Sequence, residues 1–194
     1  MKIIRYNYKN IIHIGLIIND KHVIDIKKLG VKMDDTISFI DFLSNKNFQP
    51  KKIYSENDLI ELDRIKLLSP IDKLNSLRDA YAFKNHVEAG RKGRGLPMIK
   101  EFDDFPVYYY SNHLSITNPG NIYVNKHHLK KLDFELEISV VIAKEGKNIS
   151  IDNADDYIFG FMIMNDWSAR DVQMNEMKLN LGPAKGKDFA NTLG

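Results

Sequence analysis

Two glutamates one residue apart carry the first chemistry that the sequence suggests. Glu135 and Glu137 lie in the stretch 134–143, whose alternation of apolar and polar residues predicts a β-strand. Successive side chains point to opposite faces of a strand, so both carboxylates share one face, roughly 6.6 Å apart along the strand, and their flexible ends can meet at one cation. Mg²⁺ and Ca²⁺ prefer such oxygen ligands. A half-buried strand with its charged face in water would give the same pattern.

A third carboxylate, Asp166, follows the apolar run 161–164 (FMIM), which predicts a buried strand. An unpaired charge at the end of a buried strand is costly, so this carboxylate needs a partner. The partner is either a metal ion or Arg170, four residues further along a helix predicted over 166–177.

Asp79 is the fourth candidate and opens a helix predicted over 79–91. A carboxylate in that position can cap free N–H groups or bind a metal. His86 lies two helical turns further on, on the same face and on the order of 10 Å away. A metal at Asp79 and a general base at His86 could hold a substrate of the size of a small dicarboxylate between them, although a histidine that faces solvent is the alternative.

Three further polar side chains are suited to binding an anion. The spacing of Asp166, Arg170 and Gln173 predicts one polar stripe on a helix, and Arg and Gln can bind a carboxylate or a developing oxyanion. Residues 181–187 (LGPAKGK) predict a glycine-rich loop that lacks the spacing of a nucleotide-binding P-loop. Its Lys187 either reaches an anionic group or is a solvated surface charge.

Composition bounds the remaining options. The 194 residues are 43% hydrophobic, enough for one or two domains with a core, and the formal net charge of +2 gives no reason to expect nucleic acid or a membrane surface as a partner. The absence of cysteine excludes disulfides, thiolate nucleophiles and Cys-ligated zinc, so any metal must use oxygen or histidine ligands. The polar start is not a signal peptide and no apolar run reaches the ~18 residues of a membrane span, so we expect a cytoplasmic protein.

Two regions differ in texture. Residues 1–70 predict a small N-terminal domain with strands over 11–18 and 22–26, a turn at 19–20, and helices over 37–43 and 56–65. Residues 71–194 mix strands, predicted over 107–110, 134–143 and 161–164, with helices, predicted over 79–91, 153–159 and 166–177. The order has no regular βαβ rhythm, which favours an α+β fold.

Four stretches, in this order, resemble the fumarylacetoacetate hydrolase family: 78–87 (RDAYAFKNHV), 133–137 (DFELE), 165–173 (NDWSARDVQ) and 181–189 (LGPAKGKDF). The resemblance covers about residues 65 to 194. It implies a mixed β-sandwich roll preceded by a small N-terminal domain, in an enzyme that is usually a homodimer. The family's catalytic domain continues past Gly194, so the resemblance also implies that 71–194 is the N-terminal portion of a catalytic domain truncated at the C-terminus.

The resemblance assigns roles to the candidate residues. It implies Mg²⁺ or Ca²⁺, with Mn²⁺ as a further option, at Asp79, Glu135, Glu137 and Asp166. In the hydrolase branch, the residue matching His86 activates water, those matching Arg170, Gln173 and Lys187 stabilise the oxyanion, and Tyr81 contacts the ligand. Met177 departs from the pattern, because the mammalian hydrolases have a ligand-contacting tyrosine there, and this leaves the exact keto-acid substrate open.

The implied reaction is hydrolysis of a carbon–carbon bond in a β-diketone acid, such as fumarylacetoacetate or an acylpyruvate. A β-diketone chelates a divalent cation through both oxygens, and the cation polarises the attacked carbonyl. The same site could instead decarboxylate a 2-oxo diacid, hydrate an enoic acid or exchange tautomers. A metal-binding module without catalytic activity is the third hypothesis.

Overall fold

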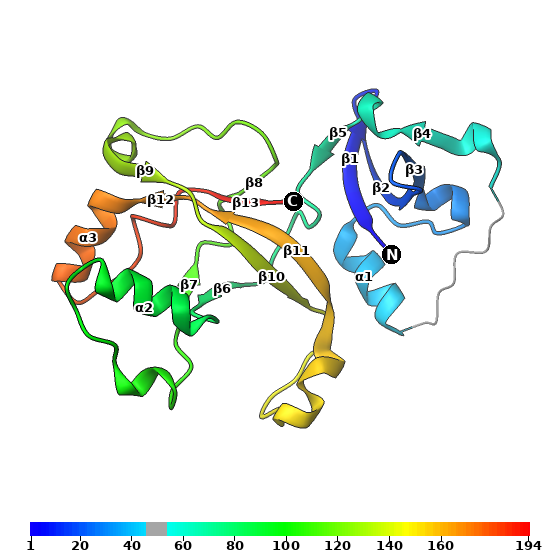
Figure 1. Ribbon diagram of the computed structural model, residues 1–194. Helices are drawn as coiled ribbons and strands as arrows, with labels where there is room; N and C mark the ends of the chain where they lie inside the picture. The colour runs from blue at the N-terminus through cyan, green and yellow to red at the C-terminus, as the bar shows by residue number, and fades with distance from the viewer. Residues whose placement is uncertain (46–53) are drawn as a thin grey trace.

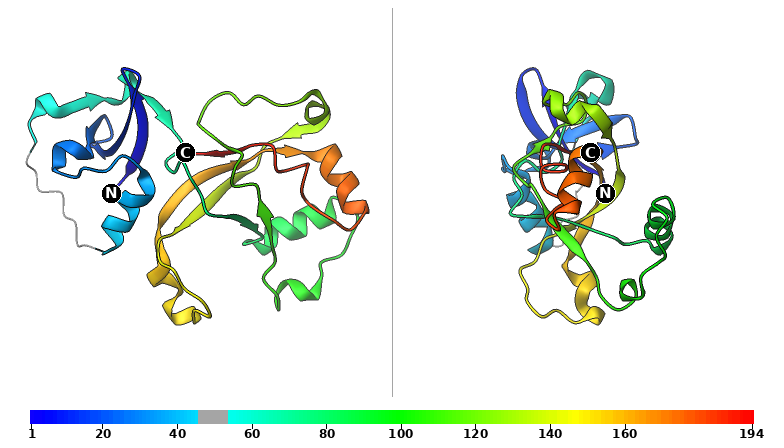
Figure 2. Two further views of the ribbon diagram at one scale, coloured as in Figure 1. Left: turned by 180° about the vertical axis from the view of Figure 1, so that it is seen from behind. Right: turned by 90° about the vertical axis from the view of Figure 1, so that its left-hand side faces the viewer.

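The structure, a computed structural model, describes residues 1–45 and 54–194, in which helices and strands are mixed (Figure 1). The described strands form four sheets, one from residues 3–68 and three from residues 77–193. The first sheet and its helix lie to one side of the other three in the two opposite views (Figures 1 and 2). The predicted division at residue 70 remains a prediction. Among the described residues, no helix has the length and apolar character that a membrane crossing requires.

The first sheet has the strand order β4-β3-β2-β1-β5, and every neighbouring pair is antiparallel. Its strands are β1 (Ile3–Tyr8), β2 (Ile11–Ile18), β3 (His22–Asp25), β4 (Leu59–Glu61) and β5 (Lys66–Leu68). Two-residue turns join β1 to β2 and β2 to β3, and all four turn residues have positive φ. Turns of this handedness match the twist of the flanking strands and fix their register.

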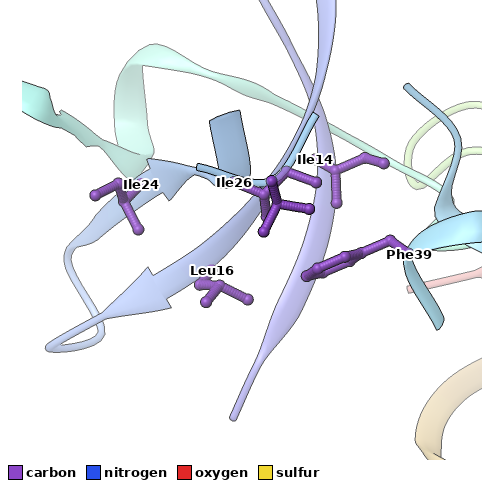
Figure 3. Close-up of a cluster of buried hydrophobic side chains, with 6 residues drawn as sticks. Ile14, Leu16, Ile24, Ile26 and Phe39 are labelled. Carbon is purple, nitrogen blue, oxygen red and sulfur yellow. The ribbon is translucent and has the colours of Figure 1, made fainter. Parts of the chain in front are cut away.

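One cluster of apolar side chains holds this part together (Figure 3). Ile14 and Leu16 share one face of β2, and Ile24 of β3 joins them. Phe39, from helix α1 (Thr36–Asn45), covers the cluster and is fully buried. The predicted strand over 11–18, the turn at 19–20 and the helix over 37–43 are therefore confirmed.

The helix predicted over 56–65 is wrong. Two short 3₁₀ turns, η2 (Glu56–Asp58) and η3 (Leu62–Arg64), flank strand β4 instead, and Ile60 pairs with Val23 of β3. Pairing along the free edge of β3 satisfies the backbone there, which local periodicity cannot anticipate. The strand predicted over 22–26 ends one residue early, because the Asp25 side chain accepts a hydrogen bond from Lys27 N and begins the 3₁₀ turn η1 (Ile26–Leu29).

The remaining sheets carry the candidate site. A four-stranded sheet has the order β10-β11-β13-β8, antiparallel except for the β13–β8 pair, and two smaller sheets pair β6 with β7 and β9 with β12. The strands are β6 (Leu77–Ala80), β7 (Tyr108–Ser111), β8 (Ile116–Thr117), β9 (Leu132–Asp133), β10 (Leu136–Ile142), β11 (Ile158–Asp166), β12 (Ser168–Ala169) and β13 (Asn191–Leu193). The three strands predicted in this region are confirmed, with shifted ends.

Two of the predicted helices begin later than expected, and both corrections bear on the site. Helix α2 (Lys84–Lys92) starts five residues after Asp79, which lies in β6. Helix α3 (Arg170–Lys178) starts after Asp166, which ends β11, because the short strand β12 intervenes. Neither carboxylate is therefore on a helix. The remaining turns are the 3₁₀ segments η4 (Lys100–Phe102), η5 (Lys126–Lys131) and η6 (Ile151–Tyr157), the last in place of the helix predicted over 153–159.

The two faces of the β10–β11 pair differ in chemistry. The expected alternation is present, but the face that carries Glu137 is half-buried, whereas Leu136 is 75% exposed and Ile138 is 71% exposed. Across the pair, Ile138 faces Ile163 and Val140 faces Phe161, and all four are exposed. The glutamates therefore do not form a charged face in water. They point to the covered side of the sheet, and the opposite side is a continuous apolar surface of the kind that association covers.

Replacing Phe39 tests the core of the first sheet. Phe39→Ala is expected to lower the free energy of unfolding by about 3–5 kcal/mol, because it removes a ring that is fully buried. Urea denaturation measures the change. Ile37→Ala on the same helix is the control, since Ile37 is 42% exposed and should change stability little. Equal effects of the two substitutions would contradict the packing described.

Candidate metal centre

Four carboxylates from distant parts of the chain converge on one point. Asp79 comes from β6, Glu137 from β10 and Asp166 from the end of β11, and Glu135 lies immediately before β10. One oxygen of each lies within 4.8 Å of the others. The structure thus brings together the four residues that the sequence singled out as metal ligands.

Strand pairing explains three of the four positions. Glu137 lies opposite Met164, and Asp166 N donates to the Glu135 carbonyl oxygen at 3.0 Å, which extends the ladder beyond β10. Glu135, Glu137 and Asp166 therefore project from one face of two hydrogen-bonded strands, where directly opposed and diagonal side chains are neighbours. The register of β10 against β11 is what places them together.

Tyr109 connects the fourth carboxylate to this group. It lies directly opposite Asp79 in the β6–β7 pair, and its hydroxyl is 2.9 Å from Asp79 Oδ2 and 2.7 Å from Asp166 Oδ2. Burial, and then the charges of Asp166 and Asp79, raise the pKa of Tyr109 above its usual range, so the hydroxyl keeps its proton as a donor. Sequence analysis missed this residue, because nothing distinguishes it from Tyr108 and Tyr110 without the strand register.

Two cations lie against the cluster. Lys187 is 3% exposed, and its ammonium group contacts Glu135 Oε2 and lies 2.6 Å from Asp166 Oδ2. Arg170 lies 2.7 Å from Glu135 Oε1 and 2.9 Å from Asp133 Oδ2. The prediction that Arg170 could pair with Asp166 is wrong, since the two residues are on different elements. The alternative of a solvated Lys187 is also wrong.

The charges leave room for a divalent cation. Four carboxylates and two cations give a formal sum of −4 + 2 = −2. Burial, and then the charges of Asp79, Asp166 and Glu135, raise the pKa of Glu137 to about 8. Burial also raises the pKa of Asp166 to about 6, although Lys187 opposes this. Burial acts in the same direction on Glu135, but Lys187 and Arg170 outweigh it and lower the Glu135 pKa.

The donor set fits a hard divalent ion. Asp166 Oδ1 is buried and has no hydrogen-bond partner among the described residues, so one ligand oxygen lacks a protein donor. All four ligands are oxygens, which suits Mg²⁺ and Ca²⁺. A cation placed among them would balance the formal charge and relieve the repulsion that raises the Glu137 pKa.

Gln173 lies close to the cluster but contacts it only through Arg170. On α3, Arg170 Nη1 donates to Gln173 Oε1 at 3.2 Å. The predicted stripe therefore contains Arg170 and Gln173 but not Asp166. Among the described residues, the amide nitrogen of Gln173 has no hydrogen-bond partner and is available as a donor.

His86 and Tyr81 are not part of the carboxylate cluster. His86 is exposed on α2, and its imidazole has no hydrogen-bonding partner in the described part of the chain. The predicted common helix face of Asp79 and His86 is wrong, because Asp79 lies in a strand. Tyr81 is exposed and lines a cavity of about 270 Å³ together with Val87 and Phe102.

A second cavity of about 210 Å³ adjoins the cluster from the side of its hydrogen-bonding partners. Tyr109 and Lys187, both of which contact Asp166, line it together with Pro183 and Ala184. None of the four carboxylates lines either of these two cavities. The walls are instead the side chains that hold Asp166 in place.

Known proteins share this sequence and fold. The family model described as "Fumarylacetoacetate (FAA) hydrolase C-terminal" matches residues 76–194. A fumarylacetoacetase of Oryza sativa subsp. japonica is 52% identical over 67 residues, which are 33% of this chain and 15% of that protein. The oxaloacetate tautomerase YisK of Bacillus subtilis (strain 168) is 30% identical over 195 residues, which cover 89% of this chain and 62% of the tautomerase.

Solved structures agree on the fold. A fumarylacetoacetate hydrolase from the psychrophilic Exiguobacterium antarcticum aligns with a TM-score of 0.70 at 21% identity, over 98% of this chain and 62% of that one. A probable 2-hydroxyhepta-2,4-diene-1,7-dioate isomerase from Mycobacterium abscessus aligns with a TM-score of 0.67 at 21% identity, over 100% of this chain and 62% of that one. The chain thus has this mixed α/β fold along its whole length and spans less than two thirds of each of these relatives.

The raised pKa of Glu137 predicts how pH acts on the metal-free protein. The folded state keeps a proton that the unfolded state loses above about pH 4.5, so the stabilisation from this group is complete below that pH and is lost as the pH rises through about 8. Thermal unfolding with a chelator, between about pH 5 and about pH 8, should show this loss in the wild type and a smaller loss in Glu137→Gln.

Added Mg²⁺ should reverse the trend, since it binds the ionised carboxylates. It should raise the melting temperature of the wild type most at the upper end of the range and leave Glu137→Gln almost unchanged. Glu145→Gln, at an exposed position outside the cluster, is the matched control and should behave as the wild type. A Glu137→Gln protein that responds to pH and Mg²⁺ as the wild type does would refute the site.

Proposed function

The chain belongs to the fumarylacetoacetate hydrolase family, and from this we propose that it is a divalent-metal-dependent hydrolase that cleaves a carbon–carbon bond in a β-diketone acid, such as fumarylacetoacetate or an acylpyruvate. The observation that carries the proposal is the cluster of Asp79, Glu135, Glu137 and Asp166 with two cations beside it. The fumarylacetoacetases among the relatives support the substrate class.

The four carboxylates would hold the cation. Bound Mg²⁺ or Ca²⁺ would supply a Lewis acid that polarises the substrate carbonyl and stabilises developing negative charge. Tyr109 holds Asp79 and Asp166 at a fixed separation through one hydroxyl. Arg170 and Lys187 fix the two oxygens of Glu135 from opposite ends of the carboxylate, which orients that ligand.

The proposed reaction adds water across one carbon–carbon bond. The hydroxyl of water joins the attacked carbonyl carbon, the bond to the neighbouring carbon breaks, and that carbon finally receives the proton. An acylpyruvate would give a carboxylate and pyruvate. Negative charge develops on the attacked oxygen and then on the departing enolate, where donors from Arg170, Gln173 and Lys187 would lower the energy.

We propose His86 as the base that takes the proton from water. A histidine titrates near neutral pH and suits this role. Its imidazole is exposed and has no other hydrogen-bonding partner among the described residues, so it is free to accept a proton. Helix α2, which carries it, lies beyond the carboxylates in the chain order of the fold and would bring His86 to the substrate from outside the cluster. Tyr81, from the segment that leads into α2, would contact the same ligand.

Tautomer exchange of a 2-oxo diacid is the second candidate. The relative named oxaloacetate tautomerase aligns with 89% of this chain, a larger share than the 33% covered by the rice fumarylacetoacetase. Such a reaction moves a proton between carbon and oxygen of an enolate and breaks no carbon–carbon bond. It would need the same carboxylates and cation but no attack by water.

Parallel assays separate the two candidates. With Mg²⁺, an acylpyruvate should be consumed with release of pyruvate, while the enol-to-keto exchange of oxaloacetate should proceed no faster than without protein. Release of pyruvate is followed by a coupled assay, and the exchange by ultraviolet absorbance. Exchange of oxaloacetate without cleavage of the acylpyruvate would replace the hydrolase proposal by the tautomerase. Binding of Mg²⁺ without turnover of either compound would leave a metal-binding module.

Replacing His86 tests the assignment of the base. His86→Ala should keep the Mg²⁺ affinity of the wild type and lose about 10²- to 10⁴-fold in turnover, the usual contribution of a general base. Isothermal titration gives the affinity and the pyruvate assay gives the turnover. His127→Ala, at another exposed histidine, is the control and should remain active. A fully active His86→Ala protein would mean that another group takes the proton.

A further inference from the structure

The glycine-rich loop 182–187 is wrapped around one side chain of helix α3. The Glu176 carboxylate accepts three backbone hydrogen bonds, from Ala184 N at 3.2 Å, Lys185 N at 2.7 Å and Gly186 N at 3.1 Å. Consecutive N–H groups that converge in this way form an anion-binding nest of the kind that binds phosphate in other proteins. Here the anion is the protein's own carboxylate, so these donors are already occupied.

The position of Glu176 in its helix is unfavourable by itself. It lies in the last turn of α3, where the negative end of the helix dipole disfavours a carboxylate. Burial also acts to raise its pKa, but the three backbone hydrogen bonds and the neighbouring Lys185 outweigh burial and lower the Glu176 pKa. An acid that conflicts with its helix and is compensated by a loop indicates that the loop contact is the reason for its presence.

Close packing fastens the loop to α3 at both ends. Gly182 has a φ of 108°, and a side chain there would approach Glu176 Cβ to 3.1 Å. A Cβ at Gly186 would lie 2.7 Å from Gln173 N, so the loop backbone touches the helix directly. The Gly186 carbonyl oxygen also accepts a hydrogen bond from Ala169 N at 2.8 Å. The loop therefore has one place on the helix, and Glu176 is at the centre of it.

The fastened loop ends at Lys187. Lys187 N donates to the Ala184 carbonyl oxygen at 2.8 Å, which closes the last turn of the loop. The ammonium group of Lys187 then lies between Glu135 and Asp166 with the side chain buried. A long lysine side chain loses considerable freedom when it is buried, so a rigid backbone beneath it reduces what remains to be ordered.

We propose that Glu176 is a positioning residue, which fixes the backbone of the 182–187 loop and through it the ammonium group of Lys187 between Glu135 and Asp166. The inference rests on the proposed function for its effect on turnover but not for its effect on metal binding. Because the ammonium group contacts the same oxygens that would bind a cation, it competes with that cation, while in the reaction it supplies a donor to developing negative charge.

Two effects should therefore appear together when Glu176 is removed. Glu176→Ala should lower turnover about 10- to 100-fold, the range seen when a residue that orients a metal-site group is lost. It should also bind Mg²⁺ more tightly than the wild type, since Lys187 no longer holds the two carboxylates. Lys187→Met should change both quantities in the same directions and by at least as much.

A double-mutant comparison tests the proposal. Glu176→Ala combined with Lys187→Met should behave as Lys187→Met alone, because both substitutions act through one ammonium group. Asn175→Ala, at the exposed neighbouring position, is the matched control and should leave turnover and Mg²⁺ affinity unchanged. Isothermal titration with Mg²⁺ alone gives the affinity and needs no substrate, so it decides the proposal even if neither proposed reaction is found.

Full additivity of the two substitutions, or a wild-type Mg²⁺ affinity in Glu176→Ala, would overturn the proposal and leave Glu176 a purely structural residue. If Glu176→Ala does not fold, Glu176→Gln replaces it. The amide keeps one acceptor oxygen but turns a second group of donors toward the loop, so it should shift the Mg²⁺ affinity in the same direction by a smaller factor. An unchanged affinity in Glu176→Gln would then overturn the proposal.

Discussion

Repulsion among four carboxylates is the constraint around which the second half of the chain is organised. Oxygens of Asp79, Glu135, Glu137 and Asp166 lie within 4.8 Å of one another, and burial makes each charge more costly than it would be in water. The protein meets part of that cost with the ammonium of Lys187, the guanidinium of Arg170 and the hydroxyl of Tyr109. The remainder is carried as a raised pKa at Glu137, the carboxylate without a cationic partner among the described residues.

The fold supplies rigid positions for these opposing groups. Two hydrogen-bonded strands hold Glu135, Glu137 and Asp166, and a second pair of strands holds Asp79 opposite Tyr109. Helix α3 and the loop that follows it bring Arg170 and Lys187 from the other side. Each charged group is thus attached to backbone that is itself hydrogen-bonded, and this keeps like charges close without letting them move apart.

The same sheet has an apolar surface on its other side. Along β10 the side chains alternate between the half-buried carboxylate face and an exposed face that carries Leu136 and Ile138. The chain spans 62% of the hydrolase structure from Exiguobacterium antarcticum, while 98% of it aligns there. The shared part of the fold therefore contains the entire carboxylate cluster, and the relatives place more polypeptide around that part than this chain contains.

Several features could be predicted from the sequence because they depend on local pattern. Alternation predicted the strand that carries Glu137, the apolar run predicted β11, and four short stretches in order identified the family and its four metal ligands. The helices that Asp79 and Asp166 were expected to occupy were wrong, because the amphipathic pattern continues backward from α2 and α3 into strands. Periodicity cannot reveal a partner strand that claims those backbone groups first.

Only the tertiary structure decided which groups surround the carboxylates. Tyr109 is one of three consecutive tyrosines, and its role follows from the register that sets it opposite Asp79. Glu176 reads as an ordinary helix-surface acid until the loop at 184–186 folds back on it. Residue types and spacing along the chain determined that a metal site of oxygen ligands could form. The pairing of strands and the closure of a loop, which join residues far apart in sequence, determined how that site is held and neutralised.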